Sequence, residues 1–402
     1  MSHRNPVHTS LFLVLVGICA AMNIWKLPPA LPFLQQELGL DLVASGFLLS
    51  SVQIAGMSLG LMTGLFAERI GLRRSILIGL LILTIAPLGA VLLQTKTALL
   101  VSRAIEGCGF LMVILPVPAL IKRLVSADLI SRMLGIWGCY MSTGAVIILL
   151  AGAWLLSMDI SWHTLWLLLS SVAFLMFLLS LVFIPSDAKT AVSAGTTTAD
   201  RPSIISMVLS TLSTFRVWLV ALTFGMYSAQ WSSVIGFLPT VYDSAGISGL
   251  VAGLLTALVA GSNVIGNLSA GRLLYKGVSV KKLLITAFLS MMIAAIVAFG
   301  LPVPVVVQFF AIVLFSILGG LIPASLFVLA VTYAPTPQTT AATVGWVQQC
   351  SSLGQFIGAP VVALVVSWLG GWQWAWVATS AFALLGIIMA LKLCTTPSDV
   401  KA

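Results

Sequence analysis

The feature that most constrains this chain is the recurrence of long apolar stretches along its whole length. Each holds roughly 20 or more residues, enough for an α-helix to cross the hydrocarbon core of a bilayer, about 30 Å thick. Only 7% of the 402 residues are charged, whereas a soluble domain carries about 25%. Because lipid offers the backbone no hydrogen-bonding partners, we expect helices, and no alternating pattern typical of a membrane β-barrel occurs.

The predicted fold class is therefore an all-α membrane protein. We place about twelve spans at residues 10–34, 42–67, 74–94, 97–120, 132–156, 162–184, 215–240, 248–271, 281–301, 303–330, 340–366 and 371–392. The polar stretch between the sixth and seventh spans predicts three parts: an N-terminal six-helix bundle at 1–184, a cytoplasmic linker at 185–214 and a C-terminal six-helix bundle at 215–402.

The net charge of +9 is distributed unevenly between the two sides of the predicted spans. Nearly all lysines and arginines fall on the side that holds both termini, and the opposite loops keep only Lys96. This is the positive-inside pattern, so we expect a bacterial inner-membrane protein with both termini in the cytoplasm. The charge orients the chain in the lipid bilayer and requires no nucleic-acid partner.

Several kinds of site are missing from the sequence. The five cysteines and three histidines are not spaced as metal ligands. No phosphate-binding Gly-x-x-x-x-Gly-Lys-Ser/Thr motif or zinc-protease His-Glu-x-x-His motif occurs. We therefore expect no cofactor, no metal and no enzymatic centre.

The two halves of the chain align with each other at a constant offset of 207 residues, without gaps. Matched glycines and prolines carry the alignment: Pro32 with Pro239, Gly46 with Gly253, Gly64 with Gly271, Pro116 with Pro323 and Gly138 with Gly345. Such a repeat indicates duplication and predicts two halves related by a pseudo-two-fold axis along the membrane normal. Transporters with this symmetry bind substrate between the halves, near the bilayer midplane.

Two short motifs are similar to those of a known family. The loop after the second span carries Gly64, Glu68, Arg69, Gly71, Arg73 and Arg74. The fourth span carries Arg103, Glu106, Gly107 and Gly109. Both resemble signatures of the major facilitator superfamily, with Glu68 where the family usually has aspartate.

The resemblance covers essentially the whole chain. It implies two pseudo-symmetric six-helix bundles that move a solute by alternating access. Stretches around Lys122 and at 236–239 are also similar to the cyanate-permease/nitroimidazole-transporter branch, although the arginine–proline pair that this branch usually carries in span one is missing.

The loop motif has a physical interpretation of its own. Cations at a cytoplasmic helix end suit the anionic leaflet. Glu68 among the arginines indicates a conformational latch that pairs in one state and releases in the other. The alternative is that the loop only anchors the topology.

Three charged residues lie deep within predicted spans: Lys26, Arg103 and Glu106. At 1.5 Å per residue they sit roughly 9–14 Å from the outer ends of their helices. Charges at such depth are costly and mark candidate functional sites. The family fold implies that the first and fourth spans line one cavity. We therefore expect Lys26 and Arg103 to bind an anionic substrate and Glu106 to exchange a proton; the alternative is a closed structural cluster.

Further polar and aromatic residues complete the candidate substrate site. Asn23 and Gln230 are matched by the repeat and lie at equivalent depth in the first and seventh spans. The remaining candidates are Tyr227, Trp231, Tyr140 and Gln348. Each of these residues has the alternative role of packing or joining helices.

The leading hypothesis is a secondary active transporter of a small anionic or polar organic solute, coupled to protons and acting as a monomer. The alternative within transport is an efflux antiporter for drugs or toxic compounds. From other classes, the alternatives are a transporter-like membrane receptor, which a long soluble regulatory extension would favour, and an intramembrane enzyme, which an inward catalytic cluster would favour; neither feature is visible in the sequence.

Overall fold

The computed structural model describes residues 6–126, 129, 133, 136–186, 203–247, 249–336 and 339–393, with the backbone alone at 63–69, 204 and 341. All regular structure among these residues is helical. The prediction of an all-α membrane protein is thereby confirmed.

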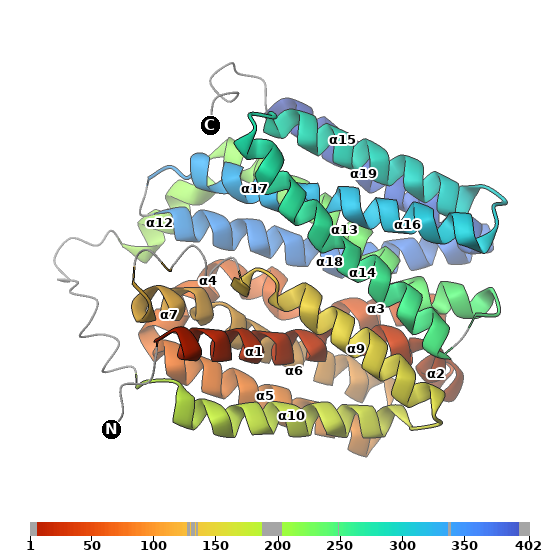
Figure 1. Ribbon diagram of the computed structural model, residues 1–402, viewed down its shortest axis with the longest axis horizontal. Coiled ribbons are helices and arrows are strands. Elements are labelled where there is room, and N and C mark those ends of the chain that lie inside the picture. The colour runs from red at the N-terminus through yellow and green to blue at the C-terminus, as the bar shows by residue number, and fades with distance from the viewer. Residues whose placement is uncertain are drawn as a thin grey trace.

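The helices of the first half lie side by side in the lower part of Figure 1. They are α1 (Pro6–Trp25), α2 (Leu27–Leu38), α3 (Leu42–Ser50), η1 (Ser51–Gln53), α4 (Ile54–Ile70), α5 (Leu72–Leu93), α6 (Lys96–Ile114), α7 (Pro116–Leu124), α9 (Tyr140–Ser157) and α10 (Trp162–Phe183). Pairs such as α1 with α2, and α6 with α7, are single membrane spans interrupted near a proline, which cannot donate the hydrogen bond a continuous helix needs.

The helices of the second half lie in the upper part of the same view (Figure 1). They are α12 (Ile204–Leu212), α13 (Phe215–Ser244), α14 (Gly249–Tyr275), α15 (Val280–Ala295), η3 (Ile296–Gly300), α16 (Val305–Gly319), α17 (Leu321–Thr332), α18 (Thr340–Leu369), η5 (Trp372–Trp374) and α19 (Ala375–Leu393).

Eleven helical segments of the described chain are long and apolar enough to span a membrane, and a bent pair formed by α12 and α13 brings the number to 12. The predicted spans agree with these segments, apart from the start of the fifth, where α9 begins at Tyr140 rather than at residue 132. The predicted linker at 185–214 falls partly outside the described residues, and its last part forms α12.

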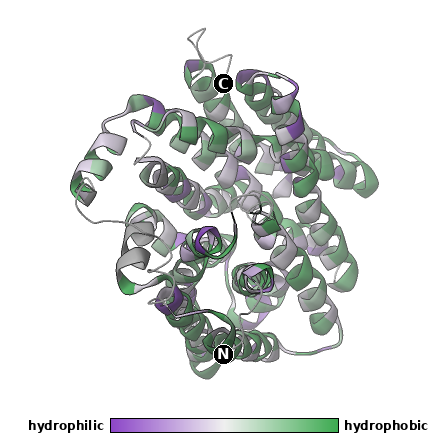
Figure 2. Cartoon of the chain, turned by 60° about the vertical axis from the view of Figure 1, so that its left-hand side comes forward, coloured by the Kyte–Doolittle hydropathy of each residue, from purple (hydrophilic) through white to green (hydrophobic). Residues whose placement is uncertain are grey.

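The surface suits a lipid environment. Large apolar side chains such as Ile85, Leu175 and Phe310 are more than half exposed. Figure 2 shows apolar residues along all the helices, with only scattered hydrophilic positions. In water this much exposed apolar surface would drive association, whereas in hydrocarbon it needs no cover.

Two helix crossings matched by the repeat join the halves, α3 and α4 against α18, and α9 against α14, and α2 also packs against α13. Small residues allow the close approach. A Cβ atom at Gly46 would lie 2.9 Å from the carbonyl oxygen of Ala359, and one at Gly253 would collide with Ala153. These two glycines are matched by the sequence repeat, so each crossing uses the same position.

A bulky side chain at Gly253 should force α9 and α14 apart. We expect Gly253→Val to lower the midpoint of thermal unfolding in detergent, with a loss of about 1–3 kcal/mol typical of overpacking. Gly271→Ala, in the same helix, is the matched control, because a Cβ there meets no atom within 4 Å. Equal stability of the two variants would contradict the close crossing.

Candidate functional site

The first membrane span is broken in its interior. Helix α1 ends at Trp25, α2 begins at Leu27, and Lys26 lies between them in a turn. Pro28 and Pro29 have no backbone N–H, so the carbonyl groups four residues earlier lose their helical partners. In a membrane such carbonyl groups need another donor.

Arg103 of α6 supplies that donor. Its Nη2 donates to the carbonyl oxygen of Ile24 at 2.8 Å, which is the acceptor that Pro28 leaves without a partner. Its Nη1 donates to the carbonyl oxygen of Asn23, also at 2.8 Å. The guanidinium therefore clamps the break in the first span to the fourth span.

The charged residues predicted within the spans form one contiguous cluster. Nη1 of Arg103 lies 2.7 Å from Oε2 of Glu106, and Nζ of Lys26 lies 3.0 Å from Oε1 of the same carboxylate. The three side chains are at most 1% exposed. Ser102 donates a further hydrogen bond of 3.1 Å to Glu106, and the ammonium of Lys26 lies 4.7 Å from the ring centroid of Trp166.

Two cations thus share one carboxylate, which leaves one positive charge uncompensated within the cluster. The expectation that Lys26 lies beside Arg103 and Glu106 agrees with the structure. However, the cluster lies within the first half, between α1, α6 and α10. It is sealed from the exterior, as the alternative of a closed cluster also requires.

A cavity lies between the two halves, next to this cluster. It encloses about 390 Å³ of space free of atoms, including its mouth, and is lined by Ile24, Trp25, Pro28, Leu49, Val52, Gln53, Ser232, Gly236, Gln355 and Ala359. Nε2 of Gln53 donates to Oε1 of Gln355 at 2.9 Å, so a pair of carboxamides joins the two halves here. The cavity therefore has a polar side built from both repeats.

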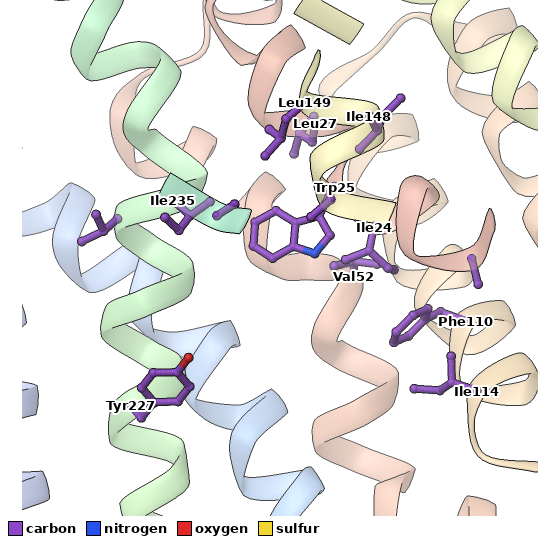
Figure 3. Close-up of a cluster of buried hydrophobic side chains, with 14 of the residues drawn as sticks. Ile24, Trp25, Leu27, Val52, Phe110, Ile114, Ile148, Leu149, Tyr227 and Ile235 are labelled. Atoms are coloured by element: carbon purple, nitrogen blue, oxygen red, sulfur yellow. The ribbon is translucent and has the colours of Figure 1, made fainter. Parts of the chain in front are cut away.

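Aromatic rings close another side of the cavity. Trp25 meets Trp231 edge-to-face, with ring centroids 5.6 Å apart. Figure 3 shows the Trp25 ring reaching from the broken first span toward α13, which carries Tyr227 and Ile235. Ile24 and Trp25 line the cavity, and Arg103 bonds the carbonyl oxygen of Ile24. The charged side chains do not line the cavity themselves, so this stretch of the first span separates them from it.

The amides predicted from the repeat are both fully buried. Nδ2 of Asn23 donates to the carbonyl oxygen of Cys19 at 3.1 Å, while its Oδ1 has no partner among the described residues. Neither polar atom of the Gln230 carboxamide has a hydrogen-bond partner in the described part of the chain. Neither amide lines the cavity.

The predicted aromatic residues pack beside the cavity or at a helix start. Tyr227 accepts a hydrogen bond of 3.0 Å from Asn263, and Trp231 donates one of 3.1 Å to Ser316. Tyr140 stacks on Trp137 with centroids 4.3 Å apart. Gln348 is half-buried on α18.

The predicted latch is described only in part. Gly71 joins α4 to α5 with φ of 103°, a conformation that favours glycine. Nη2 of Arg73 donates to the carbonyl oxygen of Leu181 at 2.6 Å, which ties this joint to the end of α10. Arg74 is exposed. The side chains of Glu68 and Arg69, and the surroundings of Gly64, lie outside the described part of the structure.

Sequence reasoning missed the neutral polar residues of the cavity, Gln53, Gln355 and Ser232. Each stands in the middle of an apolar span, and the two glutamines carry a carboxamide that is rare at that depth. The sequence identifies uncharged polar residues within spans as candidates, but it does not show which of them face the other half of the molecule.

Comparisons with known proteins place the chain among transporters. The model of the Major Facilitator Superfamily matches residues 13–344 and 220–401. The cyanate transport protein CynX of Escherichia coli (strain K12) is 26% identical over 251 residues, which cover 62% of this chain and 62% of that protein. The match therefore spans less than two thirds of the relative's length.

Solved structures share the fold at low sequence identity. A bacterial homolog to the human lysosomal transporter Spinster, in an inward-facing and occupied conformation, has a TM-score of 0.82 and 16% identity, and covers 99% of each chain. The D-xylose-proton symporter has a TM-score of 0.75 and 16% identity, over 98% of this chain and 99% of the other. The nucleoside transporter NupG has a TM-score of 0.73 and 15% identity, with the same coverage.

Removing the shared carboxylate should destabilise the first half. In Glu106→Gln the two buried cations lose their compensating charge, and breaking a buried pair in this way costs about 3–5 kcal/mol. We expect a clear drop in the thermal unfolding midpoint in detergent. Lys26→Met should cost less, because it leaves the Arg103–Glu106 pair electrically balanced. A wild-type midpoint for Glu106→Gln would contradict a tightly coupled cluster.

Proposed function

Starting from the fact that the chain belongs to the Major Facilitator Superfamily and is a transporter of that family, we propose that it is a secondary active carrier of a small anionic or polar organic solute. Transport proceeds by alternating access of the cavity between the two halves and is coupled to protons. The observation that carries the proposal is the uncompensated positive charge directly behind the cavity wall.

The charge acts through the wall rather than by contact. Lys26 follows Trp25 in the chain, and Arg103 holds the carbonyl of Ile24, so the cluster is one layer of residues from the cavity. In a medium of low dielectric constant a net charge at this range stabilises an anion in the cavity. Because Lys26 and Arg103 stay bonded to Glu106, they attract the solute without ligating it.

The polar side of the cavity supplies direct recognition. The carboxamides of Gln53 and Gln355 offer both donors and acceptors, and each half contributes one. A solute that inserts between the two carboxamides breaks the hydrogen bond between them and replaces it with bonds from each carboxamide to the solute. Binding of the solute is thereby linked to separation of the halves. Trp25 provides an apolar wall that fits a small solute.

We assign proton coupling to Glu106. Protonation of this carboxylate would leave Lys26 and Arg103 with two uncompensated charges, which raises the affinity for an anion. Binding of the anion and of the proton therefore favour each other, and this reciprocity is the condition for symport. The single hydroxyl proton of Ser102 can be donated either to this carboxylate or to the carbonyl oxygen of Ala86, so Ser102 can change its acceptor when Glu106 is protonated.

The comparisons support the same class of cargo. CynX is named for transport of cyanate, an anion, and two of the proteins that share the fold are named for a sugar–proton symport and for nucleosides. The positive-inside pattern supports an inner-membrane location with both termini in the cytoplasm, and we propose that a monomer is the transporting unit.

Efflux of drugs or toxic compounds is the second candidate. It is favoured by the largely apolar cavity lining of Ile24, Trp25, Leu49 and Val52. A hydrophobic cation would, however, meet the repulsion of the charged cluster.

Neutralising Lys26 should weaken anion transport. A unit charge about 10 Å from an anion contributes roughly 1.7 kcal/mol at an effective dielectric constant of about 20. We therefore expect Lys26→Met to raise the KM for cyanate or another small transported anion roughly ten- to twentyfold in proteoliposomes. Lys96→Met, which removes an exposed lysine at the start of α6, is the matched control. Unchanged uptake by folded Lys26→Met would eliminate the anion proposal.

Proton coupling should be visible without an imposed gradient. Adding a transported anion to the outside of proteoliposomes should alkalinise the medium, because protons enter with the solute, and a pH-sensitive dye records the change. A proton ionophore should abolish solute accumulation but not exchange. Accumulation that is independent of the pH gradient would contradict symport.

A further inference from the structure

The crossing of α4 and α18 contains a contact that the transport site does not use. At Gly60 and Gly345 the helices approach closely: a Cβ at Gly60 would lie 3.0 Å from the Cβ of Gln349, and one at Gly345 would lie 3.5 Å from the Cα of Leu61. A Cβ at Gly60 would be closer to Gln349 than side chains normally come, whereas one at Gly345 would be in ordinary contact. The side chain of Gln349 is thereby laid against the backbone of α4.

The carboxamide of Gln349 bonds two backbone groups of α4. Its Oε1 accepts from the N–H of Leu61 at 2.8 Å, and its Nε2 donates to the carbonyl oxygen of Met57 at 2.7 Å. Residues 57 and 61 are four apart, so these groups are the acceptor and donor of a single step in the α-helical hydrogen-bond ladder. α4 continues as a helix from Ile54 to Ile70 across this contact.

From this geometry we propose that Gln349 is a reversible clasp between the two halves, which holds them together on the side of the termini and opens during transport. The proposal rests on the alternating access proposed above. When α18 withdraws, the N–H of Leu61 and the carbonyl of Met57 can bond each other, so α4 is left with no unpaired backbone group. The freed carboxamide is then solvated by water entering between the halves.

This exchange makes the clasp suitable for a cycling carrier. Opening converts two bonds between the halves into one bond within α4 and bonds to water, so the barrier stays low. A buried ion pair at the same place would leave two unpaired charges when broken. Gln349 lies six residues from Gln355 along α18, roughly 9 Å toward the termini, and does not line the cavity.

The clasp exists at only one of the two crossings. The repeat matches Gln349 with Ser142, and Met57 and Leu61 with Val264 and Leu268. A serine side chain is too short for the same insertion, and Leu268 is 59% exposed. The crossing of α9 and α14 relies on side-chain packing instead, as where a Cβ at Gly261 would lie 3.2 Å from Val146.

The test measures the opening of the terminus side directly. Spin labels are placed by cysteine substitution at Lys122, at the end of α7, and at Thr332, at the end of α17, in a cysteine-free background. Pulsed electron–electron double resonance then gives the distance distribution between the halves in detergent or nanodiscs. We expect Gln349→Leu to shift the ratio of open to closed populations toward open by roughly three- to tenfold, the effect of losing about one net hydrogen bond.

Two further variants distinguish the clasp from loss of packing. Gln349→Glu, ionised, can accept from Leu61 but cannot donate to Met57, so it should shift the populations at least as far as Gln349→Leu with little change in volume. Gln373→Ala, which truncates an exposed glutamine at the other end of the molecule, should leave the distribution unchanged.

Unchanged populations in both Gln349 variants would overturn the proposal. The measurement needs no substrate, so it tests the clasp independently of the proposed cargo. If the populations shift but the protein transports no anion, the clasp proposal stands and the proposal of an anionic cargo fails. Thermal unfolding of the variants verifies that each is folded.

Discussion

The clamp of Arg103 on the broken first span is the interaction on which the rest of the site depends. Hydrocarbon penalises an unpaired carbonyl group and an unpaired charge alike. The guanidinium avoids both penalties, because it donates to the carbonyl oxygens of Asn23 and Ile24 while Glu106 balances its charge. Arginine suits this position because its planar guanidinium presents several donors at once, so that it reaches two carbonyl oxygens and a carboxylate together. The cavity wall formed by Ile24 and Trp25 therefore has a fixed support inside the first half.

In this arrangement, the residues that attract an anionic solute by their charge differ from the residues that would contact it. Charges that touched the solute directly would have to be dehydrated and rehydrated in every cycle. Here Lys26 and Arg103 pair with Glu106 rather than with the solute, and in the proposed mechanism only the net charge of the cluster, which changes when Glu106 takes up a proton, acts on the cavity. The contacts that must form and break are those of neutral amides such as Gln53 and Gln355, which exchange partners at little energetic expense.

The sequence was sufficient for the fold because hydropathy outweighs every other signal in a membrane protein. The sequence also placed Lys26 at the same depth in the membrane as Arg103 and Glu106, because position along a helix follows from its rise of 1.5 Å per residue. The rotation of each helix about its own axis is different: it depends on packing among all neighbours. Whether the charged cluster faces the cavity or lies behind its wall was therefore beyond the sequence. The role of Gln349 could not be predicted from the sequence for the same reason. It differs from the neighbouring Gln348 only in the face of α18 on which it lies.

The bend between α12 and α13 has a consequence for how the second half sits in the bilayer. The two helices meet at 78°, so when α13 crosses the membrane α12 lies almost parallel to its surface. Ile205 and Leu209, one turn apart and largely exposed, are then placed to contact the interfacial region of the bilayer. An interfacial helix at the start of the second half would anchor that half to the membrane surface independently of the linker.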